Sequence, residues 1–357
     1  MKIKILYAIQ GTGNGHLSRA TEIVPILKEL ADTDVLVSGI QGDIKLPFAV
    51  DYRLYGLSFI FGQKGGIQIL KTIMKLNPLR FIADVIRLPV KKYDVVLCDF
   101  EPVTAWACRL KGKICIGISH QNAVLHPSAP EPVKRDPAGL FLLKYYAPVT
   151  IKYGFHFVPF DEYNFTPVIR QSIRNAVPEN KGHYTVYLPA HSNEEIYSAL
   201  SVYPDTRWEV FSKHRKTAYR IGNTSFSPVS LDDFTTSLIG CKGILCTAGF
   251  ETPAEALFMG KKLCVIPMKN QYEQSCNAEL LASIGVMTLP QLKDQYHQLQ
   301  QWLEEDAAIR ISYADLTRSI LKDVILNGTK SVPAAGNYSK SALFGTRDLN
   351  HELFHRF

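Results

Sequence analysis

The chain has 357 residues, of which 46% are hydrophobic and 20% charged, and its formal net charge is +7. This length suits two domains of roughly 100 to 200 residues each, and the composition is that of a globular protein with substantial cores. The basic residues do not gather into arginine-rich runs interleaved with aromatics, so we expect no nucleic-acid partner. Phosphate-bearing ligands or an anionic membrane surface would account for the excess positive charge.

The cysteines and the apolar runs indicate where the protein works. Seven cysteines lie in mostly apolar contexts without a CxxC pair, which is typical of reduced core residues. No apolar run approaches the roughly 20 residues that span a bilayer, and the opening MKIKILYAIQ is too short for the core of a signal peptide. We expect a cytoplasmic protein, with peripheral attachment to the inner face of the membrane left open.

The first half of the chain alternates between short apolar runs and helical patterns. A predicted strand over residues 4–9 is followed by a glycine loop and then by apolar residues at helical spacing from Leu17 to Leu30. Further apolar runs occupy residues 35–38, 95–99 and 114–119. This alternation predicts a parallel sheet covered by helices, a Rossmann-like α/β domain over residues 1–160.

A second α/β series follows over residues 183–326. The apolar runs TVYLPA, WEVFSK, GILCTA and LCVIP alternate there with helical patterns. Residues 161–182 hold Pro167, Pro178 and many polar residues, so we expect the hinge in this segment. The last helix before residue 326 could belong to either domain, and residues 327–357 form a polar tail.

The glycine loop carries Gly11, Gly13 and Gly15, followed directly by His16. Backbone amides between a strand and a helix favour negative charge. A nicotinamide-binding fingerprint would need glycine in place of His16 and an acid after the second strand, which ends instead in Ser38-Gly39. At the first turn of a helix the imidazolium form is disfavoured, so His16 is a candidate general base. A histidine that caps the helix or contacts the sheet is the alternative.

The segment from residue 246 to 277 is the most informative part of the chain. A buried strand runs into Gly249, and Thr252 and Pro253 begin a helix whose first amides point where a diphosphate would lie. One turn later Glu255 offers a carboxylate for two ribose hydroxyls, a surface helix position being its alternative. The sequence therefore predicts a nucleotide site at this helix.

The order of landmarks in this segment resembles the C-terminal domain of one glycosyltransferase family, that of the lipid-linked peptidoglycan N-acetylglucosaminyltransferase and the diacylglycerol glycosyltransferases (family 28 type). The landmarks are Gly249, Thr252, Glu255, Gly260, Pro267, Gln274 and Asn277-Ala278. The likeness extends to GTGNGH, YDVVLCDFEP and ICIGISHQN. It implies a GT-B fold, with two Rossmann-like domains facing each other across a cleft, the acceptor in the first and the donor in the second.

The resemblance also implies roles for single residues. Thr252 and nearby amides would hold phosphate, Glu255 the ribose, and Gln271 and Gln274 the sugar hydroxyls, with Asn277 completing the donor motif. Phe250-Glu251 departs from the family pattern and brings a carboxylate close to the expected diphosphate. LPAHSNEE replaces a glycine-serine loop, so His191 and Ser192 are candidates for a phosphate contact, with a surface turn as the alternative.

The predicted function is transfer of a hexose or N-acetylhexosamine from a nucleotide-diphosphate sugar, UDP-linked, to a lipid-linked or glycan acceptor. Inverting transfer needs a base and a dipolar environment for the leaving diphosphate, and helix amides can supply the second without metal or cofactor. His16 is the leading base, with Asp99 and His120 as competitors. A UDP-sugar epimerase or hydrolase of the same fold, and a non-catalytic nucleotide-sugar binding protein, are the alternatives.

Residues 64–92 form a basic, amphipathic region. Lysines and arginines alternate there with aliphatic residues on both sides of Pro78, and Asp84 is the single acid. Such a region suits peripheral contact with an anionic membrane. An ordinary solvated face over a core is the alternative.

Overall fold

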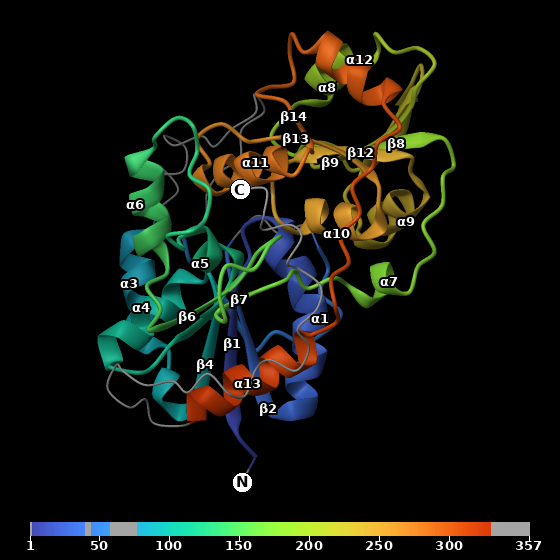
Figure 1. Ribbon diagram of the computed structural model, residues 1–357. Helices are drawn as coiled ribbons and strands as arrows, with labels where there is room; N and C mark the ends of the chain where they lie inside the picture. The colour runs from blue at the N-terminus through green and yellow to red at the C-terminus, as the bar shows by residue number, and fades with distance from the viewer. Residues whose placement is uncertain (1, 40–43, 58–76, 330–357) are drawn as a thin grey trace.

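The computed structural model describes residues 2–39, 44–57 and 77–329. Within these ranges the chain forms two parallel-rich sheets, each of seven strands, that lie one above the other in Figure 1. This confirms the predicted α/β architecture. Part of the basic region 64–92 and nearly all of the polar tail lie outside the described residues.

The first sheet is parallel throughout and has the order β3-β2-β1-β4-β5-β6-β7. Its strands are β1 (Lys4–Gln10), β2 (Asp32–Ser38), β3 (Tyr52–Leu54), β4 (Val95–Asp99), β5 (Ile116–Ile118), β6 (Ile151–Phe155) and β7 (Asn164–Phe165). The apolar side chains of β1 are fully buried, as expected of a strand covered on both faces. Strand β7 lies within the segment expected as the hinge.

The second sheet has the order β10-β11-β9-β8-β12-β13-β14 and is parallel except for the β10–β11 hairpin. Its strands are β8 (His183–Tyr187), β9 (Arg207–Ser212), β10 (Tyr219–Ile221), β11 (Thr224–Pro228), β12 (Gly243–Thr247), β13 (Lys262–Ile266) and β14 (Met287–Thr288).

Helices cover the faces of both sheets (Figure 1). The first domain has α1 (Asn14–Leu30), α3 (Pro78–Arg87), the short 3₁₀ turn η1 (Val90–Lys92), α4 (Pro102–Lys111), α5 (His120–Val124) and α6 (Pro137–Tyr146). Beyond β7 follow α7 (Gln171–Arg174), α8 (Asn193–Leu200), α9 (Leu231–Gly240), α10 (Glu251–Met259), α11 (Tyr272–Ser283), α12 (Tyr296–Glu304) and α13 (Thr317–Thr329). None of these helices has the length and apolarity needed to cross a bilayer.

Helix α13 follows the second domain in sequence but lies against the first (Figure 1). It packs on α1 and β4. Near its end the amide of Asn327 donates a hydrogen bond of 3.2 Å to the hydroxyl of Tyr153 in β6. The chain therefore crosses between the two domains twice.

The strand register places the chemistry of the first domain at one edge of its sheet. Ile9 of β1 pairs with Asp99 of β4, so Asp99 lies beside the loop that follows β1. Gly13 in this loop has φ of 90°, which favours glycine, and helix α1 begins directly after it. An apolar core continues across the domain interface, where the rings of Phe157 and Phe250 lie 5.0 Å apart.

Candidate active site

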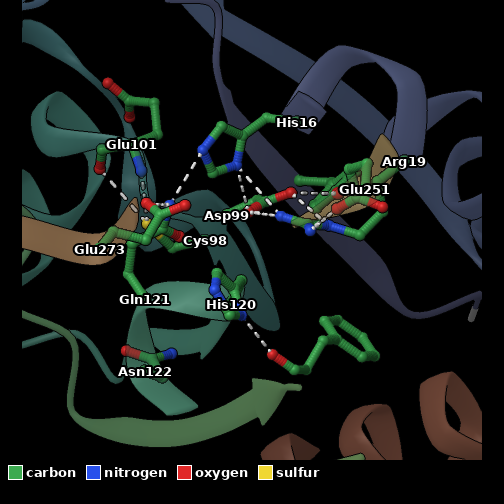
Figure 2. A network of polar contacts seen from close by, with 12 residues as sticks. His16, Arg19, Cys98, Asp99, Glu101, His120, Gln121, Asn122, Glu251 and Glu273 are labelled. Atoms are coloured by element: carbon green, nitrogen blue, oxygen red, sulfur yellow. Dashed lines mark hydrogen bonds and ion pairs between the residues drawn. The ribbon is translucent and has the colours of Figure 1, made fainter. Parts of the chain in front are cut away.

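A cleft between the two domains brings together the glycine loop and the start of α10. From the first domain it is lined by the loop over residues 12–16 and by Arg19, and from the second by Gly249, Thr252 and Glu251. Both walls lie at the carboxyl ends of parallel strands, where α/β folds bind ligands. Figure 2 shows the polar side chains that meet there.

His16 and Asp99 form a hydrogen-bonded pair on the first-domain wall. Nδ1 of His16 lies 2.8 Å from Oδ1 of Asp99. We assign the proton to Nδ1, because a carboxylate accepts, and this leaves a lone pair on Nε2, which lies 3.3 Å from Nε2 of Gln121 at the wall of the cleft. Asp99 is fully buried, and although burial favours its neutral form, the charges of Arg19 and His16 hold its pKa below the ordinary value. The pair has the geometry of an oriented general base.

Arg19 on α1 connects the two domains through this pair (Figure 2). Its Nε and a terminal nitrogen donate to the two oxygens of Asp99 at 3.1 and 2.6 Å. Its other terminal nitrogen donates to Glu251 at the start of α10. The Arg19 side chain is 2% exposed, so it is a buried cation held between carboxylates of both domains.

Glu251 is the acid that the sequence places near the expected diphosphate. Burial raises its pKa to about 7, and the charges of Glu255 and Asp99 add to this effect while Arg19 opposes it. Its Cγ lies 3.4 Å from the position that a Cβ on Gly15 would occupy, so it closes against the glycine loop. A dianionic diphosphate at this place would meet a group that is charged only in part at neutral pH.

The structure gives Glu255 a partner that the sequence did not indicate. Both of its oxygens accept hydrogen bonds from Arg170, at 2.6 and 2.7 Å, and its side chain is 5% exposed. Arg170 also donates to the hydroxyl of Thr235 on α9. The proposed ribose contact would have to share a carboxylate that already joins the hinge segment to the donor helix.

The remaining donor residues differ in how they are engaged. Gln274 accepts a hydrogen bond from the amide of Met268 at 3.0 Å, and Gln271 caps α11 by accepting from the amide of Gln274. Both also line the cleft. Asn277 is fully buried and donates to the carbonyl of Ala248, which places it beneath the loop before α10.

His120 lies in the domain interface, where it also lines the cleft. Its ring nitrogens are each 2.8 Å from an acceptor oxygen, the carbonyl of Phe155 and Oδ1 of Asn277. The ring stacks on Phe250 with centroids 4.0 Å apart. Burial lowers the pKa of His120. These contacts show His120 packed between the two domains, and its role as a competing base stays a prediction.

His191 and Ser192 serve the start of α8. Ser192 caps this helix by accepting from the amide of Glu195, and Nδ1 of His191 lies 3.3 Å from a carboxylate oxygen of Glu195. His191 lines a cavity separate from the cleft, together with Lys269 and Lys293. These contacts correspond to the local turn that the sequence left open as the alternative to a phosphate contact.

The three glycines of the loop have different surroundings. A Cβ on Gly11 would lie 2.8 Å from Cγ1 of Val37, so Gly11 permits close packing against β2. Gly13 supplies the positive φ before α1, and Gly15 faces Glu251 across the cleft. Gly13 and Gly15 line the cleft, whereas the amide of Gly11 donates a hydrogen bond of 2.6 Å to the carbonyl of Ser38 at the end of β2.

The sequence holds two motifs typical of metal binding, and the structure describes the first of them. Asp32-Thr33-Asp34 begins β2, at the end of the sheet opposite to the cleft, and Asp34 accepts from the hydroxyl of Tyr93 at 2.6 Å. The motif His351-Glu352-Leu353-Phe354-His355 has zinc-binding spacing and lies outside the described residues.

The fold and the cleft define a class of protein, the GT-B glycosyltransferases. Within this class, residues 3–305 match glycosyl transferase family 1, and the chain belongs to that family. The placement with the family 28 type is not confirmed. A search of curated proteins gave no significant match.

Solved structures agree with this fold at low sequence identity. The UDP-GlcNAc 2-epimerase from Neisseria meningitidis bound to UDP-GlcNAc has a TM-score of 0.56 at 12% identity, over 91% of this chain and 100% of that one. MurG of Acinetobacter baumannii has a TM-score of 0.51 at 15% identity, over 90% of this chain and 99% of that one. The glycotransferase of kitacinnamycin has a TM-score of 0.51 at 14% identity, over 91% of this chain and 95% of that one. These similarities show the fold alone.

Sequence reasoning missed Arg19, Gln121 and Arg170. Arg19 lies on an amphipathic helix, where an arginine is ordinarily exposed, but it is three residues after His16 and so shares its helical face. Gln121 follows His120, and its Nε2 lies 3.3 Å from Nε2 of His16 and 2.8 Å from Glu273 on α11. Helical spacing could have indicated Arg19, whereas the pairing of Arg170 with Glu255 had no local signal.

Proposed function

We propose that the protein transfers a hexose or N-acetylhexosamine from a UDP-sugar to a lipid-linked or glycan acceptor, with inversion and without a metal ion or cofactor. The observation that carries the proposal is the His16–Asp99 pair at 2.8 Å, directed at a cleft that also contains the start of the donor helix α10. A base facing a nucleotide site from the opposite domain is what inverting transfer requires.

The proposed reaction uses groups of both domains. Nε2 of His16 takes the proton of an acceptor hydroxyl, and the hydroxyl oxygen forms a bond to the anomeric carbon of the donor sugar. The bond from that carbon to the diphosphate breaks, and the diphosphate leaves with the electron pair. Amides at the start of α10, Thr252 and the cation of Arg19 would stabilise this charge. Asp99 would hold the ring of His16 in place and stabilise its protonated form.

The donor site of the proposal comprises Gly249, Thr252, Gln271 and Gln274, which line the cleft. We propose that Glu255 acts mainly by fixing α10 to the hinge through Arg170, and that any ribose contact is secondary. The family 28 likeness of this segment remains part of the proposal, because the order of its landmarks is the sequence signal for a UDP-sugar.

Peripheral membrane contact is a further part of the proposal. In α3, the described helix of the basic region, Leu79, Ile82 and Ile86 are all more than half exposed, close in sequence to Arg80 and Arg87. Exposed aliphatic side chains beside arginines suit an anionic surface. Sedimentation with phosphatidylglycerol vesicles tests this, with phosphatidylcholine vesicles as the uncharged control, and equal recovery with both would contradict it.

The nucleotide is tested by thermal stability with UDP, GDP, TDP, their sugars and NAD. A ligand present at about 100 times its dissociation constant adds roughly 2.7 kcal/mol to the unfolding free energy. We expect UDP and a UDP-sugar to raise the midpoint most. A response to NAD alone would overturn the proposal.

A UDP-sugar epimerase or hydrolase is the second candidate function. Glu251 favours it, because a buried carboxyl with a pKa of about 7, joined to His16 through Arg19, is a second group able to exchange protons near the cleft. The products separate the two functions, since an epimerase or hydrolase needs no acceptor. A non-catalytic binding protein would bind UDP-sugars and turn over none.

A further inference from the structure

A second pocket opens beside His16, on the side of the first domain. It is lined by Gln10, Thr12, Gln121, Phe100 and Tyr146, and by Leu142 and Leu143 of α6, while Asn270 to Glu273 of the second domain cover it. His16 and Gln121 line this pocket and the donor cleft alike. A ligand in the pocket would therefore lie next to Nε2 of His16, where an acceptor has to be.

Two residues that line the pocket each have a buried acceptor atom without a donor in the described part of the chain. Oε1 of Gln10 and Oε1 of Gln121 have no hydrogen-bond partner in the described part of the chain, and these residues are 3% and 4% exposed. The orientation of each amide is set by its nitrogen: Gln10 donates to the hydroxyl of Tyr146, and Gln121 donates to Glu273 and towards His16. A buried acceptor without a donor is unfavourable, so the pocket fits a ligand that brings hydroxyl groups.

One wall of the pocket is a flat aromatic surface. The ring of Phe100 stacks on Tyr146, with centroids 4.8 Å apart, and lies nearly parallel to the ring of His16 at 6.3 Å. Phe100 follows Asp99 directly and has φ of 55°, a conformation that bulky side chains rarely adopt. Strained residues of this kind are held by their surroundings and cluster at functional sites. A flat apolar wall beside hydroxyl-binding amides fits the C–H face and the hydroxyl edge of a sugar ring.

The outer wall of the pocket leads to an apolar surface on α6. Leu142 lines the pocket and is nevertheless 45% exposed, and Phe141 beside it is 65% exposed. Leu140 and Tyr145 of the same helix are exposed as well. This surface continues from the pocket to solvent and fits an alkyl chain attached to the bound sugar.

We propose that this pocket binds the acceptor, and that the acceptor is a sugar carrying an apolar chain. The sugar lies between Phe100 and the amides of Gln10 and Gln121, and its chain follows α6 past Leu142. This inference rests on the proposed transfer and names its acceptor class. A hydroxyl of the bound sugar gives its proton to Nε2 of His16 while its oxygen forms the new glycosidic bond and the nucleoside diphosphate departs.

The test measures binding to the full chain by calorimetry, without donor, for octyl β-glucoside below its micellar concentration, glucose and octanol. We expect octyl glucoside to bind at least tenfold more tightly than either of the others. No binding of octyl glucoside, or equal binding of octanol, would overturn the proposal. Binding of UDP is measured in parallel, because its absence would count against the transferase itself, whereas UDP binding without a preference for octyl glucoside counts against the acceptor class alone.

Two variants test where the alkyl chain and the sugar ring of the ligand bind. Leu142→Ser, at the surface, should weaken binding of octyl glucoside at least fivefold and leave glucose unchanged, with Leu110→Ser at an exposed site of α4 as the matched control. Phe100→Gly removes the ring and relieves the left-handed backbone, so octyl glucoside binding should fall while the thermal midpoint is kept. Equal effects of the Leu142 and Leu110 variants would contradict the course assigned to the chain.

Discussion

Replacing Glu251 by glutamine should change how the stability of the protein depends on pH. The carboxyl has its pKa raised from 4.5 to about 7, mainly by burial, although Arg19 partly compensates. Glutamine keeps the size and an acceptor oxygen for Arg19 but cannot ionise. The variant therefore isolates the cost of charging this group in the folded protein.

The direction in which stability changes with pH follows from the direction of the pKa shift of Glu251. A carboxyl with a raised pKa in the folded state contributes its full stability below pH 4.5, and this contribution is lost as the pH rises through 7. At about 1.36 kcal/mol for each unit of pKa, the loss amounts to roughly 3 kcal/mol. The Glu251→Gln protein lacks this loss, so its unfolding free energy should increase relative to the wild type by about that amount between pH 4.5 and pH 8.

Urea unfolding of both proteins at several pH values between 4.5 and 8 measures the difference. Glu29→Gln, which changes an exposed ion pair with Arg318, is the control for a change of one charge. A second readout is UDP affinity, which the variant should improve at pH 8 and leave nearly unchanged at pH 5, because the repulsion between diphosphate and carboxylate is present only at the higher pH. A difference in unfolding free energy that is flat with pH, or that falls as the pH rises, would refute the reasoning.

Three further outcomes are expected. His16→Ala should lower transfer by about 10²- to 10⁴-fold while UDP binding persists, measured by product formation and calorimetry, and unchanged turnover would exclude His16 as the base. Glu255→Ala should lower the unfolding free energy by about 3 to 5 kcal/mol, because it leaves Arg170 buried without its partner; a loss of UDP affinity at unchanged stability would favour the ribose role instead. His191→Ala should leave UDP affinity unaltered, since His191 lines a separate cavity, and a weakening of tenfold or more would return it to the donor site.

The elements of secondary structure that have a local sequence signal could be predicted. Strand β1, the glycine loop and α1 follow one another at the expected places, because a short apolar run and helical periodicity are both local signals. Asp99 could be placed near the cleft for the same reason: it ends a buried strand of a parallel sheet. The two-domain α/β architecture follows from the repetition of this pattern.

The electrostatic partners could not be predicted, because they join residues that are distant in sequence. Arg19 meets Glu251, and Arg170 meets Glu255, only after the two domains have come together. Phe250 departs from the family pattern in the sequence, and in the structure its ring stacks on His120 across the domain interface. The carboxylate of Glu255, which was predicted to bind a ribose, is thus paired with Arg170 in the hinge segment.

In the proposed reaction His16 activates an acceptor hydroxyl for sugar transfer. The most direct measurement incubates the wild type and His16→Ala with isotopically labelled UDP-N-acetylglucosamine and octyl β-glucoside and separates the products. We predict labelled octyl disaccharide and free UDP from the wild type, and UDP binding with little product from the variant. Labelled free sugar or an epimerised UDP-sugar, formed equally with and without octyl glucoside, would contradict the account.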